Sequence, residues 1–120
     1  MENTVRVIVD PRKFSEYVFK ENADHGKDIV FKSLGYTKQQ SDDLAELYRK
    51  QGAERFGKGD FKLGKTDCHG QRIVIEIVLP GVGESRGKTV YIKTGWMILP
   101  DGNIRLNTPF TGFSGRRSSC

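Results

Sequence analysis

Hydrophobic residues in the first half of the chain recur every three to four positions, which is the spacing of amphipathic helices. A first helix is predicted to begin at Asp10 and Pro11 and to fade near Asn22, because Asp caps a helix and Pro fits its first position. A second, shorter helix is predicted from residues 24–25 to Leu34, where Gly35 supplies a left-handed stop. A third helix is predicted from residue 41 and weakens at its glycine-bearing end.

The second half of the chain changes to alternating apolar and polar positions, which is typical of strands buried on one face. This alternation is clearest over residues 71–79. A long strand is predicted over residues 88–99, and a tight turn at residues 100–103 leads into a strand over residues 104–108. Residues 61–65 are predicted as a fourth strand.

Helices followed by a meander of strands predict an α+β fold in a single domain spanning residues 1–120. The N-terminal helices are expected to pack on one face of a twisted antiparallel sheet and to leave its other face partly open. The polar, basic tail over residues 114–120 is expected to be frayed.

Charge divides the chain in the same way. Residues 1–60 hold 11 basic and 11 acidic residues, whereas residues 61–120 hold nine basic and four acidic residues. The whole excess of +5 therefore lies in the predicted sheet region. Such a surface attracts polyanions such as RNA or DNA, although a charge excess that only keeps a protein soluble has the same composition.

Composition and motifs disfavour several other classes of protein. No apolar run reaches the roughly 18 residues that a membrane-spanning helix needs, and the N-terminus does not read as a signal peptide. Cys68 and Cys120 are expected to be free thiols rather than a disulfide. P-loop, nucleotide-binding glycine and zinc motifs are absent, and the acidic residues do not gather into a magnesium site. We therefore expect chemistry without a metal or other cofactor.

Metal-free RNA cleavage needs a base for the ribose 2′-hydroxyl, an acid for the leaving 5′-oxygen and cations around the phosphate. Histidine titrates nearest neutral pH and is the usual proton carrier. His25 stands at a predicted helix start, which favours a phosphate, and Lys27 adds a charge beside it. His25 is therefore a candidate catalytic residue, although a solvent-exposed histidine fits the same sequence. The other histidine, His69, is read as part of a hairpin turn.

A second group of candidates lies on the predicted strand over residues 88–99. Thr94 and Trp96 fall on the same strand face, where a hydroxyl can bind a phosphate and an indole can stack on a base. Gly95 between them is typical of a bulge or a close backbone approach. The competing interpretation places Trp96, the single Trp of the chain, in the core.

Three residues of the following strand can join this site as substrate-binding groups, and they are Arg105, Asn107 and Thr108. Arg105 fits an exposed charge at a sheet edge equally well.

The segment 94–108, taken with the upstream His25, resembles the tRNA-cleaving domain of colicin D. It is more similar still to C-terminal toxin domains of contact-dependent growth inhibition effectors from Gram-negative bacteria, which the segments 24–27 and 30–36 also resemble. The likeness covers roughly residues 14–113.

This resemblance implies a barnase/EndoU/colicin/RelE-type fold and cleavage of tRNA in the cytoplasm of an invaded cell, after delivery within a larger secreted or cell-surface effector. It also implies a cognate immunity protein and, in some relatives, an elongation factor of the target cell. Some relatives cut the acceptor stem, which we expect here, whereas colicin D cuts the anticodon loop.

When the roles of the family's motif residues are carried over, the resemblance implies that His25 is the catalytic acid or base. Thr94 stands where colicin D has a serine. Trp96 matches unchanged. The lysines that precede the colicin histidine are absent here, and Lys27 or Lys93 is expected to replace them as the phosphate clamp.

Two other functions fit the same residues. A non-catalytic RNA-binding or adaptor domain would use the same basic sheet face. A DNase or a general mRNA interferase is the third interpretation, and the scarcity of clustered carboxylates disfavours the DNase, because DNA has no 2′-hydroxyl to attack its own phosphate. An immunity protein is expected to present acidic residues to residues 61–120.

Overall fold

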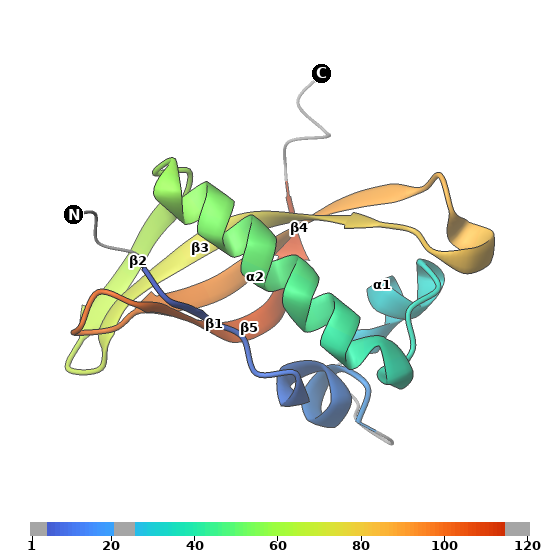
Figure 1. Cartoon of the computed structure of the whole chain (residues 1–120), viewed down its shortest axis with the longest axis horizontal. Coiled ribbons are helices and arrows are strands. Elements are labelled where there is room, and N and C mark those ends of the chain that lie inside the picture. Colours follow the sequence, from blue (N-terminus) through green and yellow to red (C-terminus); the bar gives the residue numbers. More distant parts are fainter. Residues whose placement is uncertain (1–4, 21–25, 115–120) are drawn as a thin grey trace.

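The computed structural model describes residues 5–20 and 26–114, which form a helical layer on one face of a five-stranded sheet (Figure 1). The helical segments are η1 (Lys13–Val18), α1 (Asp28–Ser33), η2 (Lys38–Gln40), α2 (Ser41–Gly57) and η3 (Gly83–Ser85). The strands are β1 (Val7–Ile8), β2 (Lys62–Asp67), β3 (Gly70–Pro80), β4 (Thr89–Ile98) and β5 (Ile104–Phe113). The predicted α+β class is confirmed.

The sheet has the strand order β1-β5-β4-β3-β2. Strands β2 to β5 form the antiparallel meander expected from the sequence. The expectation of a purely antiparallel sheet is corrected, because β1 pairs parallel with the start of β5. A two-residue strand has too little alternation to be recognised in a sequence. Strand β5 also continues to Phe113, past its predicted end at residue 108.

The first predicted helix is realised as the short segment η1, which has π-helical geometry. The backbone N–H of Phe19 donates to the carbonyl of Phe14 at 2.8 Å, five residues back. Val18 and Phe19, at the end of this wider turn, are both buried in the core. The helical stop predicted at Gly35 is confirmed by its φ of 94°.

Helix α2 crosses the sheet and supplies most of the seam between the two layers (Figure 1). Leu44 and Tyr48 are fully buried beneath it. The side chains of β3 that face the helices are at most 1% exposed, and they are Ile73, Ile75, Ile77 and Leu79. No helix in the described ranges is long and apolar enough to cross a membrane.

Helix α2 packs tightly on the sheet where Gly52 meets Trp96. A Cβ atom on Gly52 would lie 2.7 Å from Cη2 of the indole, so the ring occupies the space that a side chain would need. Trp96 is 1% exposed. A glycine is therefore required at this point of the helix by packing, and its low helix propensity is offset by the burial of the indole.

Substitution of Gly52 tests this seam. Gly52→Ala is expected to lower the free energy of unfolding by about 1–3 kcal/mol, because the added methyl group overpacks the contact with Trp96. Gly57→Ala is the matched control, since a Cβ there has nothing within 4 Å, and it is expected to be neutral or to stabilise by up to about 1 kcal/mol. Urea titrations of both variants provide the measurement. Equal effects of the two substitutions would contradict a tight seam.

Candidate functional site

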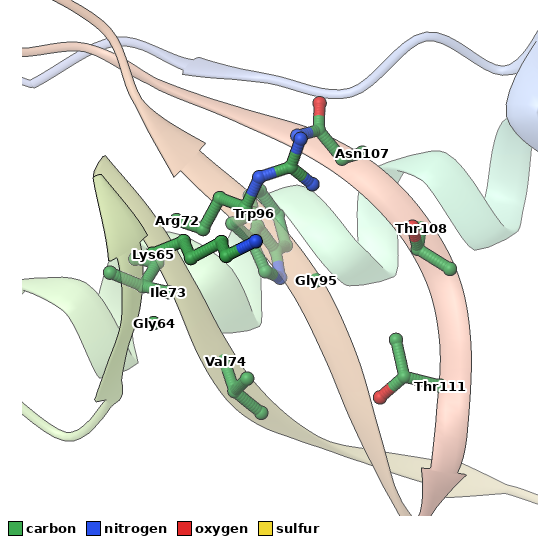
Figure 2. Close-up of a pocket in the computed structure, with 10 residues that line it drawn as sticks. All are labelled: Gly64, Lys65, Arg72, Ile73, Val74, Gly95, Trp96, Asn107, Thr108 and Thr111. Atoms are coloured by element: carbon green, nitrogen blue, oxygen red, sulfur yellow. The ribbon is translucent and has the colours of Figure 1, made fainter. Parts of the chain in front are cut away.

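The face of the sheet turned away from the helices is open and basic. Arg72 and Val74 alternate with the inward-facing residues of β3 and therefore point to this face. Figure 2 views this face, with α2 behind the strands. The cationic side chains on it are Lys62, Lys65, Arg72, Lys93 and Arg105. The basic excess that the sequence placed on an open sheet face is found there.

A hollow of about 310 Å³, here called the central pocket, lies in the middle of the open face (Figure 2). Gly95 lies at its floor, and the polar residues that line it are Lys65, Arg72, Asn107, Thr108 and Thr111. A neighbouring hollow of about 640 Å³ shares Val74 with the central pocket and is lined by Lys62, Glu76 and Lys93 among others. The two hollows thus continue along one basic surface.

Irregular pairing between β4 and β5 gives the central pocket its polar rim. Trp96 pairs with Leu106 and Gly95 pairs with Thr108, so Asn107 is an extra residue on β5. This bulge places both Asn107 and Thr108 beside the pocket instead of on opposite faces. A second shift, between Lys93 and Gly95, again leaves extra residues on β5.

The irregular segment of β5 is held from the helical side by Tyr48. The phenol of Tyr48 donates a hydrogen bond to the carbonyl of Pro109 at 2.8 Å. Burial raises the pKa of the Tyr48 phenol well above its ordinary value, with a smaller contribution from Tyr36. The phenol therefore remains a neutral donor, and helix α2 fixes the position of the strand segment that forms the pocket rim.

The structure buries Thr94 and Trp96, the two strand residues predicted for the site, although Trp96 is also among the residues that line the central pocket. Thr94 is 0% exposed and Trp96 is 1% exposed. The indole Nε1–H donates to Oγ1 of Thr94 at 2.7 Å, and this hydroxyl donates in turn to the carbonyl of Ile75 at 2.7 Å. The two residues do share a strand face, but it is the face covered by α2. The indole N–H and the threonine hydroxyl form their hydrogen bonds inside the core.

Gly95 explains how the Thr94-Gly95-Trp96 segment still shapes the site. The two buried side chains fix the strand from the helical side, and Gly95 between them faces the central pocket. A Cβ atom on Gly95 would lie 3.4 Å from Cβ of Thr108 and 3.6 Å from Cγ2 of Thr111. The absence of a side chain therefore leaves the pocket floor as bare backbone.

The remaining predicted substrate-binding residues lie on the open face. Asn107 and Thr108 line the central pocket, and Lys93 lines the neighbouring one. Arg105 lies on the same face opposite Met97 but lines neither pocket.

Of the other two predicted catalytic residues, the structure describes only Lys27, and it does not bring Lys27 into this group. Lys27 caps α1 in the helical layer, where its Nζ lies 5.2 Å from the ring centroid of Tyr17. His25 lies outside the described residues, so its distance from the sheet is not defined.

The expected hairpin turn at His69 is confirmed. Residues Cys68 and His69 connect β2 to β3, and the backbone N–H of His69 donates to the carboxylate of Asp67 at 2.8 Å. This hydrogen bond lowers the pKa of Asp67. Across the described residues, no three or more His, Cys, Asp and Glu side chains gather where they could hold a metal ion.

Sequence analysis missed Lys65, Arg72 and Thr111 as site residues. Arg72 could have been found, because the alternation over residues 71–79 places it on the strand face opposite the isoleucines. Lys65 and Thr111 depend on irregular pairing in β2 and β5, which no local pattern reveals.

Comparison with known proteins identifies both a family and a fold. A family model described as a domain of unknown function (DUF6883) matches residues 1–112. No curated protein sequence matches the chain. Among solved structures, a chain of a contact-dependent growth inhibition toxin–immunity protein complex from Klebsiella pneumoniae 342 is similar, with a TM-score of 0.59 and 22% identity. The alignment covers 84% of this chain and 89% of that chain, and it shows a shared fold.

Removal of the Tyr48 hydroxyl tests the anchor of the pocket rim. Tyr48→Phe is expected to lower the free energy of unfolding by about 1–2 kcal/mol at neutral pH, because Pro109 loses its donor. The raised pKa of Tyr48 in the folded state means that its stabilisation is complete below pH 10.0, the ordinary value, and is lost as the pH rises further.

The wild-type protein is therefore expected to lose stability above that pH more steeply than Tyr48→Phe. Urea unfolding of both proteins at about pH 7 and about pH 11 measures this difference. Parallel losses in the two proteins would show that the phenol is not the titrating group.

Proposed function

The chain belongs to the DUF6883 family, and from its open basic sheet face we propose that it is the tRNA-cleaving toxin domain of a contact-dependent growth inhibition effector. The observation that carries the proposal is the central pocket, where cations, an amide and threonine hydroxyls surround a backbone floor. A basic surface of this kind suits a phosphate backbone. The fold shared with a chain of the Klebsiella pneumoniae toxin–immunity complex supports the toxin role and, with it, a cognate immunity protein.

In the proposed reaction the ribose 2′-oxygen attacks the adjacent phosphorus, and the 5′-oxygen leaves. One group takes the 2′-hydroxyl proton and another protonates the leaving oxygen, giving a 2′,3′-cyclic phosphate and a 5′-hydroxyl without a metal. His25 is proposed as one of these proton carriers on the basis of its sequence context. Lys27, Lys93 and Arg105 are the proposed sources of positive charge at the phosphate.

The other predicted residues take supporting roles in this proposal. Asn107 and Thr108 line the pocket and orient the RNA. Thr94 and Trp96 act as positioning residues, since their buried hydrogen bonds hold the strand that carries Gly95.

The proposed substrate is tRNA, cut in the acceptor stem rather than the anticodon loop, in the cytoplasm of the target cell. A larger secreted or surface-exposed effector delivers the domain, and an elongation factor of the target cell assists it if cleavage requires a host protein. These details come from the resemblance of His25 and of residues 24–27, 30–36 and 94–108 to C-terminal toxin domains of contact-dependent growth inhibition effectors.

A non-catalytic RNA-binding or adaptor domain is the second candidate function. The observation that favours it is the lining of the two pockets, which contains no histidine among the described residues. The same cations would then bind RNA without cutting it.

Cleavage in the presence of EDTA separates these functions. Total RNA incubated with the purified protein and EDTA, with and without cytosolic extract, is expected to yield discrete tRNA fragments ending in a 2′,3′-cyclic phosphate. RNA that stays intact under both conditions while it binds the protein would favour the adaptor function.

Substitution of the two histidines tests the proton carrier. His25→Ala is expected to reduce cleavage by about 10²–10⁴-fold, because a proton-transfer group is lost, with an unchanged circular dichroism spectrum. His69→Ala is the matched control and is expected to retain activity. His69 lies in an exposed turn, and its hydrogen bond to Asp67 comes from the backbone N–H, which the substitution keeps. Full activity of His25→Ala would reject the role assigned to this residue.

A further inference from the structure

We propose that the central pocket is a nucleotide subsite in which Lys65 and Arg72 hold one RNA phosphate and Asn107 contacts the neighbouring base. The inference rests on the proposed function, because it takes RNA as the ligand. It adds two residues that the sequence motifs did not single out, and it assigns the pocket to one phosphate and one base.

Two cations from neighbouring strands reach over the same hollow. Lys65 extends from β2 and Arg72 from β3, and Figure 2 shows both side chains above the pocket. Within the described part of the chain, Lys65 forms no ion pair. Nε of Arg72 lies 4.0 Å from the carboxylate of Asp67, at the outer limit of an ion pair. Both charges therefore remain available to an anion.

The backbone of β2 explains why Lys65 reaches the pocket. The pairing of β2 with β3 shifts register between Leu63 and Thr66, so Gly64 and Lys65 lie in a bulge. A Cβ atom on Gly64 would come within 3.4 Å of the carbonyl of Arg72, so the two strands run close together here. A bulge re-aims a side chain, and here it turns Lys65 toward the pocket.

Asp67 is held in the β2–β3 turn, and its two oxygens have different partners. Oδ1 accepts the backbone N–H of His69 at 2.8 Å, whereas Oδ2 lies 4.0 Å from Nε of Arg72 and leaves the Nη1 and Nη2 groups of the guanidinium for another anion. The guanidinium of Arg72 points from β3 toward Asn107 in Figure 2. A guanidinium presents paired donors that match two phosphate oxygens, which is the contact that we assign to Arg72.

The rest of the lining suits a nucleotide better than a simple anion. The amide of Asn107 offers both donors and an acceptor, as the edge of a base does. The hydroxyl of Thr111 donates to the carbonyl of Lys93 at 3.2 Å, and its methyl carbon Cγ2 lies beside the floor at Gly95, where it offers an apolar contact to a base or ribose. The floor at Gly95 lets a ribose or base approach the backbone. A volume of about 310 Å³ is at the lower end of ligand pockets, which fits one nucleotide rather than several.

Binding of an uncleavable RNA tests this subsite independently of catalysis. The probe is a fluorescein-labelled hairpin that copies a tRNA acceptor stem and carries 2′-O-methyl riboses, and its binding is followed by fluorescence anisotropy at several salt concentrations. The double variant Lys65→Ala, Arg72→Ala is expected to bind about tenfold more weakly at about 0.1 M salt. Its slope of log affinity against log salt is expected to fall by about 1, because one neutralised phosphate is lost.

Two control variants separate the pocket from general charge. The double variant Lys38→Ala, Lys50→Ala removes the same charge from the helical layer, where both lysines are exposed, and is expected to keep the wild-type slope. Arg72→Lys keeps the charge and is expected to keep the slope while losing about two- to fivefold in affinity, because the paired donors are gone. Matching thermal unfolding of all variants confirms that they are folded.

The outcomes distinguish this inference from the proposed function. Wild-type affinity and slope in the double pocket variant would overturn the subsite, whatever happens to cleavage. Failure of the wild-type protein to bind the hairpin at low salt would overturn it as well. A protein that leaves RNA intact in extract but binds the hairpin through Lys65 and Arg72 would keep the subsite and reject the nuclease. Polyglutamate serves as a second probe that has acidic side chains but no phosphate or base. If the double pocket variant binds RNA like the wild type but no longer binds polyglutamate, the subsite is overturned and the pocket is assigned to an acidic protein partner.

Discussion

The contact between the indole of Trp96 and the bare backbone of Gly52 is the constraint on which the rest of the structure depends. It presses α2 onto the middle of the sheet, and it turns Trp96 and Thr94 toward the helices. Since side chains alternate along a strand, Gly95 must then face the opposite side. The core packing on one face of β4 thus decides that position 95 faces the open side of the sheet. Because this residue is a glycine, the hollow there has no side chain at its floor.

The second tie between the layers runs from Tyr48 to Pro109, and it acts on the neighbouring strand. Extra residues in β5 would otherwise be free to adjust their pairing, because a bulge interrupts the regular ladder. With Pro109 held from below, Asn107 and Thr108 are presented together on the open face. The helical layer therefore shapes a site that it does not touch.

The sequence predicts those parts of the molecule whose pattern is local. The periodicities for α2 and for the strands β3 to β5 are long enough to identify each element. Alternation also puts Thr94 and Trp96 on one strand face, but it cannot say which face the helices cover, because β4 carries apolar residues such as Met97 on the other face as well. The bulges that aim Lys65 and Asn107 are properties of strand pairing, so no single segment reveals them.

The central pocket has main-chain atoms of Gly95 at its floor and side chains only at its rim. Residues that the fold needs are therefore different from residues that would contact a ligand. The rim side chains stand on strand positions that contribute little to the core, so their replacement leaves the scaffold intact. Such a scaffold can exchange one recognition surface for another by a few substitutions.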